Sequence, residues 1–393
     1  MSKTKMLFML AASLMVNHAF AQFTGTGYYR VQNQATERYI TIIDNQARVS
    51  TVATDVDFGA LQTLRKFENV VGNPGSIIYI RKEQGVANKY SLCSQGTDTK
   101  TITGELLNIT RSSTNNQAWW AWGSRSGATI YLNDVIKYDY STGLPTDTAQ
   151  VASNAAASST TRNWYILPVK SDVDNQYFGI KPEVKVGDKY YATMYAFFPF
   201  KPAVSGMKVY RIVATGKGMA ASQEITGIVP ISTPVLIECP SANYADNRID
   251  IVDEQVAALT DNMLQGVWFC SHGSGHVNRK ANNPTTMRVL GTTATGELAF
   301  VKAPASYLNY NAGVGYLPAN KAYLAVDASM AAELKVVSLE DYQAGVHTVS
   351  MSNGKADTGV YTLTGTQVRQ RGQGTDGLNK GVYIVNGKKV VIK

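Results

Sequence analysis

Cysteine is scarce in this chain of 393 residues, which holds only Cys93, Cys239 and Cys270. An odd number leaves at least one thiol without an intramolecular partner. Cys239 and Cys270 fall in the same predicted domain, and two alternatives stay open for them. They form a disulfide, or they are buried free thiols in a domain whose core is large enough to be stable without a disulfide.

Long apolar runs are also missing. Apart from Met6–Val16, no segment approaches eighteen apolar residues, so we expect no transmembrane helix. Met6–Val16 follows Lys3 and Lys5 and precedes the small residues of the A-F-A sequence at 19–21. This order predicts a secretory signal peptide, residues 1–21, cleaved before Gln22. An uncleaved anchor would need a longer apolar run, and no cysteine follows the cleavage site to carry a lipid.

Basic charge is concentrated in the tail. The whole chain has a formal net charge of +8, and its last residues, Asp341–Lys393, hold seven Lys and Arg against three Asp. A nucleic-acid-binding protein usually concentrates basic charge on its folded body, so we expect no nucleic-acid partner. The basic tail instead suits export or contact with anionic surface polysaccharide.

Signatures of catalysis are absent. The chain has no G-x-S-x-G, H-E-x-x-H, phosphate-binding or EF-hand motif. Cys270, His272 and His276 lie close together and suggest a zinc site or a Cys–His nucleophile. A structural zinc lacks a fourth ligand there, and a nucleophile lacks an orienting partner. We therefore interpret this segment as surface histidines beside a buried cysteine, and predict no metal and no cofactor.

Carboxylates also come together at Asp250, Asp253 and Glu254. A glycosidase holds two carboxylates at a separation of about 5–10 Å, which sequence alone does not determine. We therefore assign no catalytic role to these carboxylates and predict no catalytic residue.

What the chain does have is the composition of an all-β protein. It contains 22 Tyr and 33 Gly, and its Val-, Ile- and Thr-rich runs are short and bounded by turn residues. We predict a first domain at 22–170, a second at 171–340 and a small C-terminal β domain at 341–393, with the first boundary inside Ser171–Gln176.

The first domain shows a weak internal repeat. Each copy is expected to be a β-hairpin followed by an aromatic strand. The hairpins are expected at Gly27–Asp44, at Ser76–Gly96 and from Ala128 onward, and the strands at Leu64–Phe67, Gln117–Trp122 and Arg162–Leu167. The stretch Ser141–Thr161 is rich in Ser, Thr and Ala and is predicted to be a long loop.

This segment resembles the ricin-type β-trefoil lectins, which open with a Y-Y-R-I-x-N sequence and carry one Q-x-W motif per repeat. Gln117-Ala118-Trp119 matches that motif in full, whereas the third copy keeps only Trp164. The resemblance implies a β-trefoil in which Trp119 and Trp164 belong to the core. It also implies carbohydrate binding.

Binding a sugar requires an exposed aromatic face with Asp or Asn beside it. Strand alternation puts Trp120 on the face opposite Trp119. One candidate group is therefore Trp120 with Asn133 and Asp134. A second group consists of Tyr39, Asp44 and Asn45. The alternative is that these are ordinary surface residues beside core aromatics.

The second domain reads as short strands without alternating helices, which favours an antiparallel β-sandwich. The expected strands are Tyr190–Phe200, Met207–Val213, Ile225–Ile228, Thr233–Glu238, Met287–Leu290, Glu297–Val301 and Ala322–Ala325. Asp253–Leu264 has apolar residues near helical spacing and is predicted to be a short helix or a loop.

The C-terminal 35 residues contain short strands at Val360–Leu363, Thr366–Arg369 and Gly381–Val385. A return strand, Lys388–Lys393, follows the turn dipeptide Asn-Gly at 386–387. The sequence G-x-Y-x-L-x-G followed by G-V-Y-I-V-N-G-K-K-V resembles the type IX secretion sorting domains of exported Bacteroidetes proteins. The resemblance implies recognition by an export machinery and a location at the cell surface or outside the cell.

Together these features predict an exported, non-catalytic protein that binds a glycan through its first domain. Two alternatives stay open. One is an extracellular hydrolase acting on polysaccharide or protein, and the other is a structural or adhesive surface protein without sugar sites.

Overall fold

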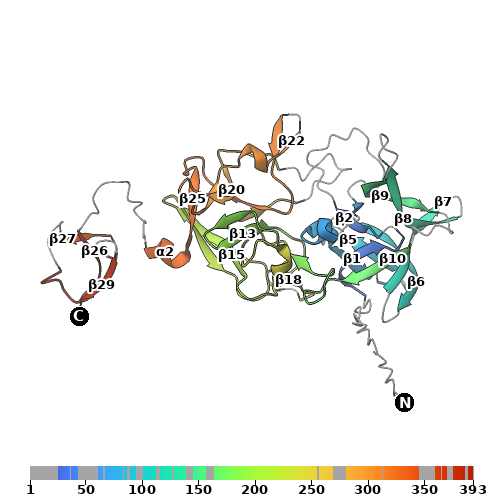
Figure 1. Ribbon diagram of the computed structural model, residues 1–393, viewed down its shortest axis with the longest axis horizontal. Coiled ribbons are helices and arrows are strands. Elements are labelled where there is room, and N and C mark those ends of the chain that lie inside the picture. Colours follow the sequence, from blue (N-terminus) through green and yellow to red (C-terminus); the bar gives the residue numbers. More distant parts are fainter. Residues whose placement is uncertain are drawn as a thin grey trace, which may run out of the picture. The chain divides into compact units, whose positions relative to one another are not determined.

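The computed structural model describes residues 25–42, 61–93, 101–155, 163–268, 280–344 and 359–392, apart from single residues and short stretches within these ranges. Within 61–64 and 91–155 it describes the backbone only. The regular structure of the described residues is mostly strand, with α1 (Phe67–Val70) and α2 (Leu339–Ala344) as their α-helices, so the all-β prediction is confirmed. The chain forms two compact units, of which the first ends at Phe178 and the second begins at Gly179 (Figure 1).

Six strands of the first unit pair in a closed ring. β1 pairs with β4, then β5, β6, β7 and β10 follow in turn, and β10 returns to β1. All these pairings are antiparallel, so every ring strand has a partner on each side. The ring strands are β1 (Gly27–Asn33), β4 (Ile78–Lys82), β5 (Lys89–Cys93), β6 (Thr101–Arg111), β7 (Asn116–Arg125) and β10 (Asn163–Pro168).

Four further strands of this unit lie outside the ring: β2 (Tyr39–Ile42), β3 (Leu61–Leu64), β8 (Ala128–Tyr138) and β9 (Pro145–Ala155). The predicted first hairpin is confirmed, because Gln32 of β1 pairs with Tyr39 of β2. Its turn is stabilised by the Asn33 side chain, which accepts a hydrogen bond from the Ala35 amide, and by Glu37 in the left-handed region at φ 58°. The second predicted hairpin is confirmed as β4 and β5.

The long loop predicted at Ser141–Thr161 is wrong, because residues Pro145–Ala155 form β9. This strand pairs with β8 along most of its length and with β3 on its other side. Pro, Asp, Asn and Ala in this segment have weak strand propensity, but two neighbouring strands satisfy the backbone groups of β9 from both sides. Tertiary pairing therefore overrides local composition at this point.

The predicted aromatic strand Leu64–Phe67 is also only partly right. The strand ends at Leu64, and Phe67 begins the short helix α1. The Phe67 ring lies 6.4 Å from that of Tyr39 and 5.4 Å from that of Tyr177. Packing against these rings draws Phe67 out of the line of β3.

The buried centre of the unit contains a charged side chain. Arg30 of β1 is 1% exposed and is surrounded by backbone carbonyls rather than carboxylates. Its guanidinium donates to the carbonyls of Val71, Gln176 and Tyr177 and to the Ser76 hydroxyl, at 2.9–3.3 Å. These bonds tie the first strand of the unit to its last residues. Burial lowers the pKa of Arg30 to about 10, which leaves it charged at neutral pH.

The second unit is organised around a ten-stranded sheet with the order β12-β13-β17-β15-β16-β25-β21-β20-β24-β19. All its pairings are antiparallel except that of β16 with β25, which is parallel. These strands are β12 (Val184–Val186), β13 (Lys189–Met194), β15 (Lys208–Gly216), β16 (Met219–Glu224), β17 (Val235–Cys239), β19 (Leu264–Gly266), β20 (Met287–Thr292), β21 (Leu298–Val301), β24 (Ala322–Ala325) and β25 (Glu333–Ser338). Outside this sheet, β14 (Phe200–Pro202) pairs with β18 (Arg248–Ile251), and β22 (Asn309–Asn311) forms a hairpin with β23 (Val314–Tyr316).

The ten-stranded sheet curls back on itself. The Met263 amide, just before the last strand in this order, donates to the Ile212 carbonyl of β15 at 2.7 Å. One core cluster accordingly contains residues from β15 and β19, the strands that meet where the sheet curls back, and from strands between them. Its members are Ile212, Ala220, Leu264, Phe300, Ala322, Leu324 and Leu334. The apolar residues that meet across the curl exclude water from its interior.

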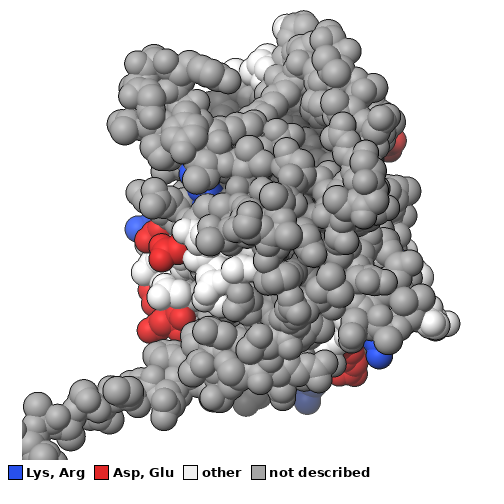
Figure 2. Space-filling model, turned by 90° about the vertical axis from the view of Figure 1, so that its right-hand side faces the viewer, with Lys and Arg blue, Asp and Glu red and all other residues white. Residues whose placement is uncertain are grey.

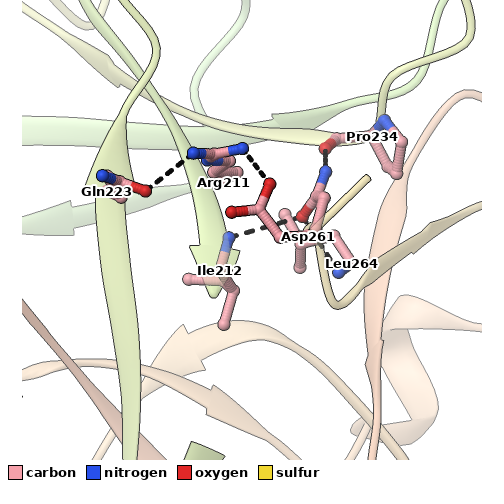
Figure 3. A network of polar contacts seen from close by, with 7 residues as sticks. Arg211, Ile212, Gln223, Pro234, Asp261 and Leu264 are labelled. Atoms are coloured by element: carbon pink, nitrogen blue, oxygen red, sulfur yellow. Dashed lines mark hydrogen bonds and ion pairs between the residues drawn. The ribbon is translucent and has the colours of Figure 1, made fainter. Parts of the chain in front are cut away.

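Asn262 holds the closing point of the curl together through hydrogen bonds to Ile212, Pro234 and Leu264, the partners labelled in Figure 3. Its Oδ1 accepts from the Ile212 amide at 3.4 Å and the Leu264 amide at 3.1 Å, and its Nδ2 donates to the Pro234 carbonyl at 2.7 Å. Beside it, Arg211 pairs with Asp261 and donates to Gln223 at 2.8 Å.

This network also decides between the helix and the loop predicted for Asp253–Leu264. The described residues of the segment contain no helix, and its end is held against β15 instead. The strand predicted at Ile225–Ile228 is wrong, because β16 ends at Glu224 and Gly227 turns the chain at φ 88°.

Four C-terminal strands form a separate sheet in the order β27-β26-β28-β29. They are β26 (Val360–Thr362), β27 (Gln367–Arg369), β28 (Gly381–Val385) and β29 (Lys388–Ile392), which confirms the strands predicted there. The last two pair up to Val385 opposite Lys388, so they flank the predicted Asn-Gly turn. Val360 is fully buried, whereas Leu363 and Val391 are exposed.

Candidate functional site

The first candidate group lies on two neighbouring strands of the first unit. Trp120 is in β7, opposite Leu106 of β6, and the next residue, Ala121, lies opposite Tyr131 of β8. Asn133 follows two residues along β8, next to Asp134. The three residues, which are 13 and 14 positions apart in the sequence, therefore lie on neighbouring strands of the sheet.

The Q-x-W strand β7 also lies beside the strand that carries Trp164. Ala118 pairs with Trp164, and Trp119 pairs with Asn163. Trp164 is 1% exposed, so its predicted place in the core is confirmed. The strands that hold the predicted core tryptophans and the first candidate group are therefore consecutive neighbours in the order β10, β7, β8.

The second candidate group does not provide an exposed aromatic ring. Tyr39 is 6% exposed, and its ring packs against Phe67. Burial raises its pKa, while the nearby Arg30 acts in the opposite direction. Tyr39 is thus a core residue and offers no face for a sugar. Asp44 and Asn45 lie outside the described residues.

The Cys–His segment at Cys270, His272 and His276 also lies outside the described residues. Cys239 is a buried free thiol whose pKa is raised to about 12 by burial. Within the described part of the chain, no group of three His, Cys, Asp or Glu side chains is arranged to hold a metal ion. Asp250 lies in β18, and Asp253 and Glu254 follow it on the exposed surface.

A polar cluster in the second unit was not singled out from the sequence. Glu238 of β17 is a buried carboxylate, only 8% exposed. It forms an ion pair with Lys189, and the hydroxyls of Tyr191 and Tyr210 donate to its Oε2, each at 3.4 Å. Burial and the charge of Glu238 raise the pKa of Tyr191 to about 12 and raise that of Tyr210 as well, so both hydroxyls stay protonated. The signal in the sequence is a Glu within an otherwise apolar strand, V-L-I-E-C.

One face of the molecule shows side chains of both charges among its described residues (Figure 2). The face in Figure 2 shows acidic and basic side chains in small separate groups among the described residues. None of the described helices is long and apolar enough to cross a membrane. This agrees with the prediction of no transmembrane helix.

No family model matches this chain, and no curated protein and no solved structure is significantly similar to it.

Proposed function

We propose that this protein is an exported, non-catalytic carbohydrate-binding protein that works at the cell surface or outside the cell. In this proposal the first unit is a β-trefoil related to the ricin-type lectins and binds the glycan. The second unit is a β-sandwich-like module, and the C-terminal sheet is a sorting domain recognised by the export machinery.

One observation carries the proposal. The first unit closes six antiparallel strands into a ring, and the Q-x-W strand β7 is bonded within it to the Trp164 strand β10. A closed ring with hairpin strands outside it is the kind of architecture that the trefoil resemblance implies. The adjacent strand β8 carries Asn133 and Asp134, the hydrogen-bonding residues that a sugar site beside Trp120 requires.

Glycan-array binding by the chain 22–393 tests this function. We expect a specific signal that Trp120→Ala weakens at least tenfold, because the substitution removes the aromatic face on which a sugar would stack. Tyr310→Ala is a matched control, since Tyr310 is an aromatic residue of a strand in the other unit and is 52% exposed.

Unchanged binding by Trp120→Ala, or a blank array from protein with an intact melting transition, contradicts the proposal. The alternatives of a hydrolase and of an adhesive protein without sugar sites would then be the next to test.

A further inference from the structure

We propose that the second unit carries its own binding site for a neutral saccharide, centred on Glu238. The site is a patch on one face of four adjacent strands, which we call the Glu238 patch. It consists of Lys189, Tyr191, Lys208, Tyr210, Glu224 and Glu238. This inference does not depend on the first unit.

The register of the sheet places these residues on one face. Glu238 of β17 lies opposite Tyr191 of β13 on one side and Lys208 of β15 on the other. Tyr210, two residues beyond Lys208, lies opposite Glu224 of β16. Residues directly opposite each other in a sheet share a face, as do residues two apart along one strand. β13 and β15 can be followed in Figure 1.

The patch is where this face opens to solvent. The next pair on the same face, two residues further along each strand, consists of Thr193 and Leu236, and both are buried. Within the patch, by contrast, the side chains of Lys189, Lys208 and Glu224 are 53%, 47% and 43% exposed, around a Glu238 side chain that is 10% exposed. A ligand can therefore approach a carboxylate that the protein itself holds in a fixed position.

The charges of the patch select a neutral ligand. Two lysines and two glutamates are already paired, Lys189 with Glu238 and Lys208 with Glu224 at 3.5 Å. A cationic or anionic ligand would have to displace one of these partners and would gain no net charge pairing. A sugar hydroxyl displaces nothing, because a carboxylate has about four acceptor sites and an ammonium three donors.

The aromatic rings of the patch, those of Tyr191 and Tyr210, are half-buried. On the opposite face of the same hairpin, the Lys185 ammonium covers the ring of Tyr190, 5.4 Å from its centroid. In the described part of the chain, no ring or cation stacks on Tyr191 or Tyr210. Hydrogen bonds to Glu238 restrain their hydroxyls, so both rings are oriented before a ligand arrives. Oriented aromatic faces beside fixed polar groups are what a saccharide site requires.

The test uses the chain 22–393 on an array of neutral oligosaccharides. We expect signals that persist in Trp120→Ala but fall at least tenfold in the double variant Tyr191→Phe/Tyr210→Phe, which keeps the rings and removes the hydroxyls that bond to Glu238. Lys208→Ala/Glu224→Ala alters only half-exposed side chains and should weaken the same signals without unfolding the sheet. Lys185→Ala, on the opposite face, should leave them unchanged.

The outcomes separate the two sites. If Trp120→Ala abolishes every signal, the Glu238 patch is not a saccharide site, although the proposed function of the first unit stands. Signals that both patch variants leave at wild-type strength overturn the inference as well. If signals survive Trp120→Ala in full and depend on the patch, the proposed function of the first unit fails and the present inference stands. A blank array overturns both.

Discussion

Replacing Arg30 by Met should strongly destabilise the first unit. The guanidinium makes four hydrogen bonds, three of them to backbone carbonyls, and lies 5.2 Å from the centroid of the Phe67 ring. A hydrogen bond from a charged donor contributes about 1.5–3 kcal/mol, so the four contribute roughly 6–12 kcal/mol. Burying the charge costs about 3 kcal/mol, to judge from the lowering of the Arg30 pKa from 12.5 to about 10.

Methionine fills much of the same volume but donates nothing. The substitution removes the cost of burying the charge, but it also removes the four hydrogen bonds. It leaves the buried carbonyls of Val71 and Tyr177 without the donor that Arg30 supplied. We expect the free energy of unfolding to fall by about 4 kcal/mol, in the range found when one partner of a buried charged contact is removed.

Urea unfolding of the chain 22–393, followed by tryptophan emission, measures this loss, because four of the five tryptophans lie in the first unit. Lys82→Met is the matched control, since it removes an exposed cation from the neighbouring strand β4 and should change stability by less than about 0.5 kcal/mol. Equal midpoints for Arg30→Met and Lys82→Met would refute the reasoning, because the buried bonds would then contribute nothing net.

Two further predictions concern the second unit and the tail. Asn262→Ala should lower the free energy of unfolding of the second unit by about 2–3 kcal/mol, because it leaves the Ile212 amide and the Pro234 carbonyl without their side-chain partner. Calorimetry measures this loss beside that of the control Asn243→Ala, which removes a cap from an exposed turn. Equal losses in the two variants would contradict the closing role of Asn262. Deleting residues 341–393 should keep the protein from reaching the cell surface or medium of an organism with type IX secretion, as immunoblots of cell fractions and medium would show, and normal export of the truncated chain would refute the sorting role.

Local sequence signals determined the strands that alternate regularly between turn residues. The hairpin around Asn33 and the C-terminal strands were predictable, because period-two patterning and turn dipeptides act over a few residues. The burial of Trp164 was predictable as well, through the Q-x-W resemblance. By contrast, β9 has no local signal: its Ser-, Thr- and Ala-rich sequence is a strand because β3 and β8 pair with it.

The same division holds for the sites. The sequence identified Trp120, Asn133 and Asp134 as residue types suited to sugar binding, and strand pairing places them on the neighbouring strands β7 and β8. It also proposed Tyr39, which the tertiary structure buries against Phe67, since sequence patterns do not show which aromatic residue faces the core. Glu238 was missed because its partners, Lys189, Tyr191 and Tyr210, lie 28 to 49 positions away and meet it only through strand pairing. Composition and periodicity thus determined that this protein is all-β, whereas long-range pairing alone decided which polar side chains converge.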